Sequence, residues 1–472
     1  MRLTRRNFLA SAASAAVLAP TARVLGANDD IRVGVVGLRG RGAAHVRAFG
    51  KMDGVRVAAL CEVDEAILDQ RAKEFEEPFG KMTKYQDIRK LLEDPSIDAL
   101  CIATPNHWHA LATIWGCQAG KDVYVEKPVA FDLWEGRQMI NAARKHDRIV
   151  QVGTQRRSDE QLREWLPRLR DGELGKVKRV RVIHFSNRKS IGPPVASGKP
   201  PASVNHDLWS GPAPLGPITR QNYHYDWHWF WDTGNGELGN NGPHSLDLAR
   251  WVIGADAFPK GVVSIGGRYG WNDSGETPNT HVVYYDYEPA PILIEVRNLP
   301  TPKEQLPSGV KVGMVVECEH GSYAGMHKGT IFDEKGKVVQ KINGDGGRGH
   351  QANFINAMRS RKSGDLNCDI EQGHLSTGLC HLGNISHRVG AAASPEQIKE
   401  HVQGGSFTAE AYERMLGHLQ ENKALPQGTT ITQGLQLSFD PATERFVGSD
   451  AETANRLLRR EYRKPYVVPE QV

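Results

Sequence analysis

Apolar and polar positions follow two different patterns along the chain, and the first pattern occupies residues 31 to about 153. Short, almost uninterrupted apolar runs alternate there with longer segments whose apolar positions recur at helical spacing. Such runs are typical of buried parallel strands, and the segments between them predict amphipathic helices. The strands are predicted at 31–37, 55–61, 99–104, 122–125 and 149–153, and the helices at 41–52, 65–75, 108–120 and 134–146. This order predicts an α/β domain over residues 30–153 with a doubly wound parallel sheet.

After residue 153 the pattern changes to alternating apolar and polar positions, in segments joined by turns rich in Gly and Pro. Alternation predicts an antiparallel sheet with one covered face. The strands are predicted at 177–185, 261–269, 281–287, 292–296 and 310–318, and the helices at 158–169, 244–253, 351–361 and 375–388. We therefore expect a second, α+β domain over residues 154–393 with a large, mostly antiparallel open sheet.

Two segments stand outside this pattern. Residues 188–220 are rich in Pro, Gly and Ser and predict a long surface excursion. Residues 394–472 predict a C-terminal extension with two more helices and a polar tail, which we expect to pack on the second domain.

The first 27 residues have the layout of a signal peptide. Arg5 and Arg6 stand together ahead of a modest apolar stretch at 8–18, and small residues suited to cleavage follow. A twin-arginine (Tat) leader delivers an already folded protein to the export machinery, so we expect that machinery as a partner and a periplasmic location. The alternative, a buried N-terminal helix, fits poorly with Pro20 and the small residues around it.

Composition excludes several classes of function. The formal net charge is +4 over 472 residues and the basic residues form no stripe, so nucleic acid is not an expected partner. No segment after the leader has the run of about 18 to 20 apolar residues that crosses a bilayer, so no membrane span is expected after cleavage. The six cysteines form no C-x-x-C pair, and folding before export favours buried free thiols over disulfides or a metal framework.

A glycine-rich turn joins the first predicted strand to the first predicted helix. Its residues are Gly37, Leu38, Arg39, Gly40, Arg41 and Gly42. Glycines here allow a tight turn and let the backbone approach a pyrophosphate, which binds the free N–H groups at the start of the helix. Arg39 stands where such turns usually carry their second glycine, and Gly40 supplies the flexibility instead. Arg39 or Arg41 is then placed to contact a phosphate.

Glu62 ends the second predicted strand, about 20 residues after the turn. A carboxylate there accepts hydrogen bonds from the ribose hydroxyls and repels a 2′-phosphate, which favours NAD over NADP. The sequence therefore predicts a Rossmann domain that binds NAD. No nucleotide pool is expected outside the cytoplasm, so an exported protein must hold its NAD tightly and recycle it.

Two further motifs follow predicted strands of the first domain. One spans 103–109 and contains Thr104, Asn106 and His109, and the other is Glu126-Lys127-Pro128. Together with the glycine-rich turn they resemble the glucose-fructose oxidoreductase / inositol dehydrogenase / rhizopine-catabolism (Gfo/Idh/MocA) family, over about residues 31–390, and in particular its exported branch.

This resemblance implies roles for the motif residues. Thr104, Asn106, His109 and Glu126 are expected to help bind the cofactor. Lys127 is expected between the nicotinamide and the substrate hydroxyl, where an ammonium orients the oxygen and helps move its proton. Pro128 is the candidate for a cis peptide bond. The resemblance also implies a homodimer or homotetramer built on the second domain's sheet.

A second candidate catalytic element is Asn240 and His244, four residues apart. The family pattern has Asp at the first position, where it supports the charged form of the His that accepts the hydroxyl proton. The amide of Asn240 orients a ring but does not stabilise imidazolium. His244 is therefore either a proton acceptor with altered support or only the cap of the helix predicted to begin beside it.

The substrate-side candidates come from two segments. Tyr223, His224 and Trp229 belong to the aromatic stretch 223–232, which either stacks on a sugar or packs in the core. His224 and His228, with Asp226 between them, have the spacing of metal ligands, but no third ligand follows, and we predict no metal. Arg156 and Arg157, at the domain junction, either approach the substrate or are solvated charges.

These inferences together predict an NAD-dependent oxidoreductase that acts on a CH–OH group of a sugar, polyol or glycoside. Its small-molecule carbohydrate substrate would also return the cofactor to its starting state in a second half-reaction. The alternative is a redox-neutral glycoside hydrolase or epimerase that uses NAD catalytically through transient oxidation, elimination, hydration and reduction.

Overall fold

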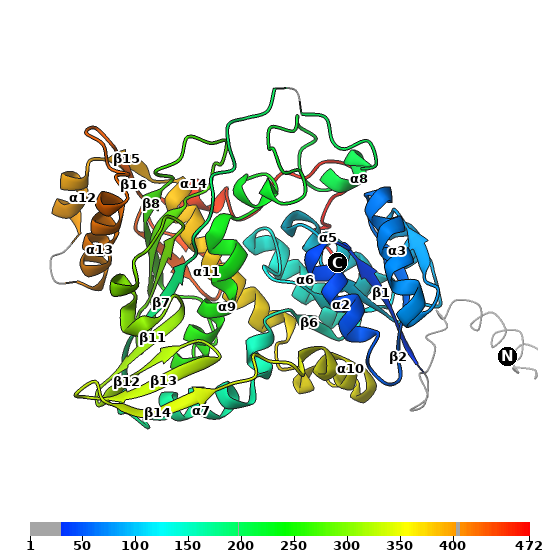
Figure 1. Cartoon of the computed structure of the whole chain (residues 1–472), viewed down its shortest axis with the longest axis horizontal. Helices are drawn as coiled ribbons and strands as arrows, with labels where there is room; N and C mark the ends of the chain where they lie inside the picture. The colour runs from blue at the N-terminus through cyan, green and yellow to red at the C-terminus, as the bar shows by residue number, and fades with distance from the viewer. Residues whose placement is uncertain (1–29, 197, 403–405) are drawn as a thin grey trace, which may run out of the picture.

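A computed structural model describes residues 30–196, 198–402 and 406–472. The expected leader, residues 1–27, lies outside the described residues. Two domains lie side by side, and the C-terminal segments reach both of them (Figure 1). No helix among the described residues combines the length and apolar character that crossing a membrane requires.

The N-terminal domain is built on a six-stranded parallel sheet in the order β3-β2-β1-β4-β5-β6. Its strands are β1 (Ile31–Val36), β2 (Val55–Cys61), β3 (Thr83–Tyr85), β4 (Ala99–Ile102), β5 (Asp122–Val125) and β6 (Val150–Val152). Its helices are α2 (Gly40–Phe49), α3 (Glu65–Phe79), α4 (Ile88–Leu92), α5 (Asn106–Gln118) and α6 (Leu133–Lys145). The predicted doubly wound sheet is confirmed. The strand order reverses between β1 and β4, where such sheets bind ligands beyond the carboxyl ends of their strands.

The second domain contains a large open sheet in which, among the strands that the structure describes, only β7 and β10 pair in parallel. The order is β14-β13-β12-β11-β7-β10-β9-β8-β16-β15, and β17 pairs with both β8 and β18. The strands are β7 (Val177–Phe185), β8 (Gly261–Gly267), β9 (Thr280–Asp286), β10 (Ile292–Arg297), β11 (Val312–Cys318), β12 (Gly321–Gly325), β13 (Lys328–Asp333), β14 (Val338–Asn343), β15 (Ala391–Ala393), β16 (Ile431–Gln433), β17 (Leu437–Asp440) and β18 (Arg445–Val447). The predicted mostly antiparallel sheet is confirmed. The prediction missed strands β12 to β14, which are short and show little apolar alternation.

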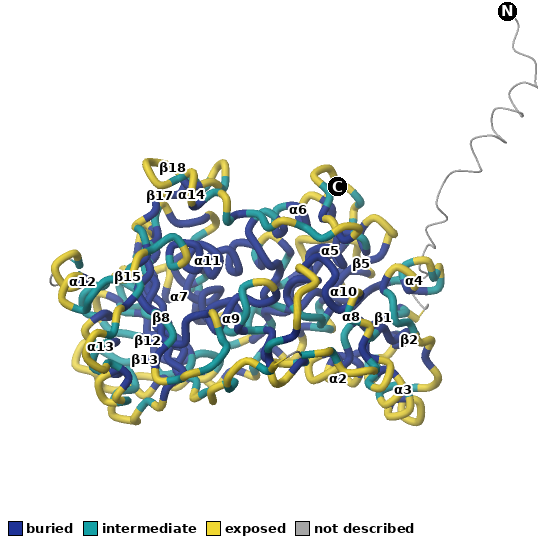
Figure 2. The backbone as a smooth tube through the Cα atoms, turned by 90° about the horizontal axis from the view of Figure 1, so that it is seen from above, coloured by how far each residue is buried: buried dark blue, intermediate teal, exposed yellow. Residues whose placement is uncertain are grey.

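Helices cover one face of this sheet and bury its main core. These are α7 (Glu160–Arg170), α9 (Gly236–Ile253) and α11 (Ile370–Arg388), and buried parts of α9 and α11 lie in the interior (Figure 2). A fourth helix, α10 (His350–Ser360), packs instead in the core of the N-terminal domain.

Helix α9 begins about two turns before the predicted 244–253. Its first part contains glycines and Pro243, which are unfavourable in a helix interior, and the predicted helix began after them. Those glycines have a packing role, because a Cβ on Gly242 would lie 3.1 Å from Sγ of Cys380 in α11.

The C-terminal extension contains α12 (Pro395–His401), α13 (Phe407–Glu421) and α14 (Ala451–Asn455) besides strands β16 to β18. Helix α13 packs on the second domain, on the side of the sheet opposite α9, against Leu293. The last residues run to the N-terminal domain, where Tyr466 and Val468 join its core (Figure 1). The first part of the extension thus packs on the second domain as expected, whereas the tail packs on the N-terminal domain. The sequence did not indicate this, because the tail has only a few apolar residues and they follow no periodic pattern. All six cysteines are buried and unbonded.

Candidate active site

A cavity of about 700 Å³ lies at the carboxyl ends of the parallel strands, between the two domains. Most of the predicted site residues line it: Gly37, Leu38, Arg39, Gly40, Arg41, Glu62, Thr104, Asn106, His109, Glu126, Lys127, His224, Asn240 and His244. Four predicted substrate residues, namely Arg156, Arg157, Tyr223 and Trp229, do not line it. The glycine turn and the candidate catalytic pair, which are far apart in sequence, therefore share one space.

The glycine-rich turn has the shape of a phosphate cradle. Gly37 has a φ of +82°, and a Cβ on Gly42 would lie 1.7 Å from the carbonyl oxygen of Gly37. Both positions thus require glycine. A Cβ on Gly40, by contrast, would meet no atom within 4 Å, so this residue faces open space.

Helix α2 starts at this turn without a side-chain cap, its N-cap residue being Arg39. The first N–H groups of a helix have no intrahelical partner, and here no cap replaces one. Together with the approach left open at Gly40, this arrangement fits a pyrophosphate bound to backbone N–H groups.

Glu62 closes the other side of the turn from the end of β2. Its Oε2 accepts a 2.8 Å hydrogen bond from the Leu38 N–H, and its Oε1 accepts one of 3.2 Å from Asp64. Burial raises the pKa of Glu62, while these backbone donors oppose the rise. Each carboxylate oxygen keeps a lone pair for a ribose hydroxyl, as an NAD site requires.

Glu126 is the buried electrostatic centre of the site. Burial acts to raise its pKa, but hydrogen bonds and charges from His45 and Arg41 hold the pKa well below its ordinary value. His45 Nε2 lies 2.8 Å and Arg41 Nε 2.6 Å from Oε1 of Glu126. Arg41 is thus engaged by a carboxylate, which leaves Arg39 as the arginine of the turn with the exposed, unpaired side chain among the described residues.

Lys127 extends into the cavity directly after β5. Its ammonium donates a 2.6 Å hydrogen bond to the backbone carbonyl of Asn240, and the Lys127–Pro128 peptide bond is cis. Burial lowers the pKa of Lys127, and the carboxylate of Glu126 opposes that shift. The hydrogen bond ties the N-terminal domain to α9 at the bottom of the cavity.

His244 lies one helical turn after Asn240 on the same side of α9. Burial, followed by the nearby charge of Lys127, lowers the pKa of His244 well below its ordinary value. Its Nδ1 is buried and binds no described group. The ring is therefore neutral at pH 7: the carboxylate of Glu126 favours its protonated form, but burial and the charge of Lys127 outweigh that effect.

His109 and Asn106 hold the cavity wall in place. The two ring nitrogens of His109 lie 2.6 Å from the carbonyl oxygen of Pro128 and 2.8 Å from that of Thr104. A neutral ring has one N–H, so His109 donates to one of these carbonyls at a time. Asn106 donates a 2.9 Å hydrogen bond to Asn235 across the domain boundary.

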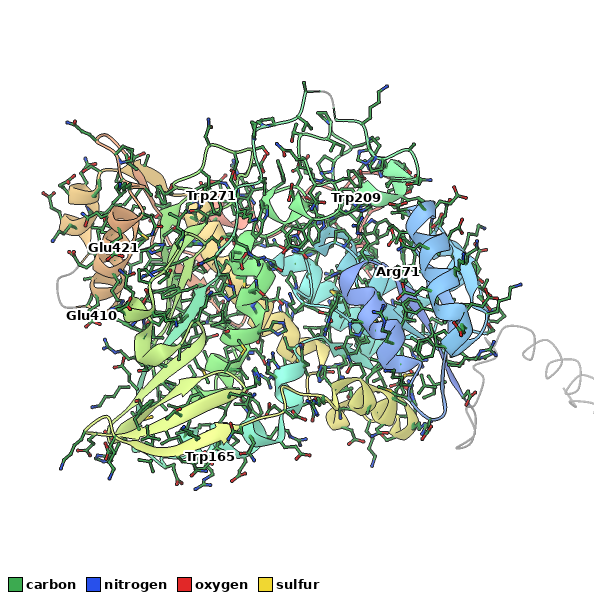
Figure 3. The ribbon with its side chains drawn as sticks, in the orientation of Figure 1. Arg71, Trp165, Trp209, Trp271, Glu410 and Glu421 are labelled. Carbon is green, nitrogen blue, oxygen red and sulfur yellow. The ribbon has the colours of Figure 1, made fainter. Side chains whose placement is uncertain are left out.

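The aromatic stretch divides between the cavity wall and the core. Tyr225, Trp227 and His228 line the cavity, and the ring of His228 stacks on Trp227 with centroids 3.6 Å apart. Tyr223 packs behind them against Trp209, and buried Trp229 lies under the guanidinium of Arg188. Trp209 itself lies on α8 (His206–Ser210), part of the excursion over the N-terminal domain (Figure 3).

The His-x-Asp-x-His arrangement considered for a metal is dispersed. His224 Nε2 pairs with Asp64 at 3.0 Å, while His228 Nδ1 contacts the carbonyl of Tyr225 at 2.5 Å. Asp226 accepts a hydrogen bond from the backbone of Asn222. Within the described residues, no cluster of three His, Cys, Asp or Glu side chains is arranged to hold a metal ion.

The two junction arginines hold the structure together away from the cavity. Arg157 Nε lies 2.8 Å from the fully buried carboxylate of Asp247, and Arg156 donates to the carbonyl of Gly346 at 2.6 Å. The neighbouring Gln155, which belongs to the same junction segment but was not a predicted site residue, lines the cavity instead.

Other residues missed from the sequence are His45, which binds Glu126, and Glu237 with Arg188. Arg188 Nη1 donates to the hydroxyl of Tyr225 at 3.0 Å, while the rest of its guanidinium binds Glu237. These contacts join residues far apart in the chain, and no local sequence signal marks them.

Comparison with known proteins identifies both domains. Residues 31–154 match the family described as "Oxidoreductase family, NAD-binding Rossmann fold", and residues 193–406 match "Oxidoreductase family, C-terminal alpha/beta domain". The chain is 29% identical to myo-inositol 2-dehydrogenase of Thermotoga maritima over 165 residues, which make up 35% of this chain and 47% of that protein. It is 33% identical to a glycosyl hydrolase family 109 protein of Shewanella pealeana over 122 residues, which make up 25% of this chain and 27% of that protein. The matched part thus spans about half or less of these relatives.

A solved structure extends the likeness of fold. The WlbA dehydrogenase from Bordetella pertussis, in complex with NADH and UDP-GlcNAcA, has a TM-score of 0.57 and 20% identity, covering 76% of this chain and 97% of that chain. The two matched domains are consistent with the glycine cradle at α2 and with the Glu126-Lys127 segment after β5. The chain belongs to the Gfo/Idh/MocA family of oxidoreductases.

Proposed function

We propose that the protein is an NAD-dependent oxidoreductase that acts on a CH–OH group of a sugar, polyol or glycoside. The observation that carries this proposal is the single cavity in which the phosphate cradle and Glu62 meet Lys127 and His244. NAD bound in this cavity supplies a two-electron acceptor for hydride from the carbinol carbon.

Two side chains of this site are suited to handle the proton of the substrate hydroxyl. The ammonium of Lys127, held by the carbonyl of Asn240, orients the substrate oxygen and stabilises the negative charge that develops on it. Neutral His244 accepts the proton. Asn240 contributes through its backbone carbonyl, which positions Lys127.

The wall opposite Lys127 supports a carbohydrate substrate. Tyr225, Trp227 and His228 offer aromatic faces, on which the C–H faces of sugars stack. The guanidinium of Arg188, which contacts this wall at Tyr225, is occupied by Glu237 and Tyr225. This arrangement favours a neutral sugar or glycoside.

A second candidate is the redox-neutral glycoside hydrolase or epimerase. Asn240 in place of a carboxylate leaves His244 a weak base, which suits a cycle that returns its electrons to the same substrate. Similarity to glycosyl hydrolase family 109 proteins over the N-terminal domain points the same way. Here the substrate carbon is oxidised, the aglycone is eliminated, water adds and the carbon is reduced again.

Incubation of the purified protein with aryl glycosides separates the two candidates. Net oxidation leaves a lasting absorbance at 340 nm, whereas the redox-neutral cycle releases aglycone without such a signal. Lys127→Ala is expected to abolish either activity, and unchanged turnover in this variant would refute both.

We further propose export through the Tat pathway to the periplasm with tightly bound, internally recycled NAD. Mass spectrometry of the nucleotide released from denatured protein tests retention, and fractionation of cells that carry an Arg5→Lys/Arg6→Lys leader tests export. Release of no nucleotide from freshly purified protein would contradict retention.

A homodimer or homotetramer remains our proposal for the assembly. Helix α13 already covers part of the outer sheet face, where Arg414 binds buried Glu295 at 2.8 Å. A second copy would therefore bind beyond this helix, along β11 to β14, and light scattering of the intact protein tests the stoichiometry.

A further inference from the structure

A second cavity, of about 300 Å³, lies behind the wall of the first, and the proposed function makes no use of it. It is formed mainly by the loop between β5 and α6, the segment just before α9, one face of α11 and the tail after α14. Asn235 separates the two cavities. It lines the second one, and its side-chain oxygen accepts the hydrogen bond from Asn106 of the first.

Two arginines of this cavity have no carboxylate partner within the described residues. The guanidinium of Arg460 lies 4.2 Å from the centre of the Phe131 ring, and that of Arg388 lies 5.1 Å from the centre of Trp231. Arg460 Nη2 donates to the carbonyl of Asp232 at 3.0 Å, while its Nε and Nη1 are buried and bind no described group. Buried donors of a charged group without an acceptor are unfavourable, so they indicate a ligand that supplies anionic oxygens.

The other charged groups of the cavity are one buried carboxyl group, that of Asp132, and side chains that are paired or exposed. Asp132 accepts backbone hydrogen bonds from Glu135 and Arg460, both of 2.9 Å. The remaining arginines form the pairs Arg456–Glu452 and Arg459–Glu470, and the exposed acidic residues are Asp232 and Glu461. Arg388 and Arg460 are therefore the arginines of the cavity without an ion pair. Arg460 still acts on the buried carboxyl groups of Asp132 and Glu135, whose pKa values burial raises, and Arg388 lies near Asp232 and Glu276.

Two buried acceptors on α11 complete the site. His381 and Asn384 are each only 5% exposed. Asn384 donates through Nδ2 to the carbonyl of Asn235 at 2.9 Å, and its Oδ1 has no described partner. The ring of His381 binds the carbonyl of Ala130, and burial lowers the pKa of His381 to about 3, so the ring is neutral. A carbonyl only accepts, so the unpartnered Nε2 of His381 carries a lone pair.

We propose that this second cavity is a binding site for a small hydroxylated acid, a sugar- or polyol-sized molecule that carries a carboxylate or phosphate. The oxyanion binds Arg460 and Arg388, and hydroxyl groups donate to Asn384 and His381. The two aromatic rings beside the guanidinium groups supply apolar contact for the carbon skeleton. The size of the cavity is at the lower end of the range for small-molecule sites.

The position of Asn235 connects this site with the first cavity. Its side chain binds Asn106 and the carbonyl of Phe131, while its own carbonyl binds Asn384. A ligand that fixes Asn384 therefore also restrains the wall of the cofactor cavity. Any effect on nucleotide affinity must be reciprocal, since the coupling free energy is shared by both ligands.

Calorimetric titration of the holoenzyme tests the proposal. The probes are D-gluconate, D-glucose 6-phosphate, D-glucose and inorganic phosphate, and the Lys127→Ala background prevents turnover. At least one of the two acids is expected to bind about tenfold more tightly than glucose and inorganic phosphate, because only the acids carry both an oxyanion for the arginines and several hydroxyl groups for Asn384 and His381.

Arg388→Gln, an exposed change that leaves the core intact, is expected to weaken binding of that acid about tenfold. Arg456→Gln is the matched control, because Arg456 already pairs with Glu452, and it should change the affinity less than about twofold. Arg460→Gln tests the buried nitrogens of Arg460 directly. If Arg460→Gln is unstable, Arg388→Gln still tests the proposal.

Failure of both acids to bind below about 10 mM, equal binding to Arg388→Gln and the parent, or equally tight binding of inorganic phosphate would each overturn the proposal. The outcome of this binding test is independent of the oxidoreductase proposal. A protein that binds the acid in an Arg388-dependent way but oxidises no carbohydrate would contradict only the latter.

Discussion

Replacement of Glu62 by Gln isolates the charge that we expect to select NAD over NADP. The amide keeps the size of the side chain, and its oxygen still accepts from the Leu38 N–H at the 2.8 Å contact. Its NH2 group cannot accept from the Asp64 N–H, so the weaker 3.2 Å contact is lost. What changes is the negative charge beside the ribose. The 2′-phosphate of NADP would lie next to this position, whereas NAD has a hydroxyl that donates to it.

The expected magnitude follows from Coulomb's law. Two unit charges at roughly 4 Å interact by about 4 kcal/mol at an effective dielectric constant of about 20. Glu62 is half-buried, so we take about half of this value, about 2 kcal/mol, or roughly a 30-fold change in affinity. Loss of the charged hydrogen bond to ribose should also weaken NAD binding about tenfold.

Titration of nucleotide-free protein with NAD and NADP measures both effects as dissociation constants. The matched control is Glu65→Gln, which removes the same charge from an exposed position at the start of α3 and should leave the preference unchanged. A ratio of the two constants that moves less than about threefold in Glu62→Gln would refute the electrostatic account of selectivity.

Three further changes test the cradle, the domain junction and the proton acceptor. Gly40→Ala should fold normally, because its methyl group meets no atom, yet lower NAD affinity more than about tenfold by occupying the pyrophosphate position. Arg157→Ala leaves the buried carboxylate of Asp247 unpaired and should cost about 3–5 kcal/mol in urea unfolding. His244 must be neutral to accept a proton, and its pKa lies well below its ordinary 6.5. Activity should therefore be lost only as pH falls through that low pKa, and His244→Gln should lower kcat and remove this acid limb.

Each of these expectations has a result that contradicts it. NAD affinity within about twofold of wild type in Gly40→Ala would exclude phosphate binding at the turn. Exposed Arg163→Ala is the control for Arg157→Ala and should change stability by less than about 0.5 kcal/mol; equal effects of the two would show that the buried pair is not special. A pH profile with an acid limb above pH 6.5 that survives in His244→Gln would assign the limb to another group.

The cofactor side of the site was predictable because its residues lie at strand ends that the apolar pattern locates. Gly37 follows β1, Glu62 follows β2 and Lys127 follows β5. In a parallel sheet these ends meet at one edge, so the sequence alone indicates a shared cavity. Periodicity also gives the helices that cover each sheet.

The substrate side was less predictable because its residues belong to irregular segments. Gln155 and Arg157 lie in the same short 3-10 helix, yet Gln155 lines the cavity while Arg157 binds Asp247, which is remote in sequence. In the aromatic stretch, the backbone conformation directs Trp227 to the cavity and Trp229 to the core. Such choices follow from long-range packing and not from the local pattern.

The tail gives a physical reason to expect slow nucleotide release. Arg463 donates to Asp207 of α8 at 2.6 Å, and the Tyr466 hydroxyl donates to the same carboxylate at 2.8 Å. The neighbouring residues Leu208 and Trp209 of α8 line the cofactor cavity. Movement of this wall must therefore break contacts with the tail.

The rest of the extension ties the two domains to each other. Glu444 binds Arg137 of α6 in the N-terminal domain and, at 3.1 Å, His374 of α11 in the second domain. Opening the cleft and moving α8 thus both require contacts of one C-terminal segment to break. Since each contact adds to the barrier for opening, a chain with this extension should hold its nucleotide longer than the same two domains without it, which is the property that a recycled cofactor requires.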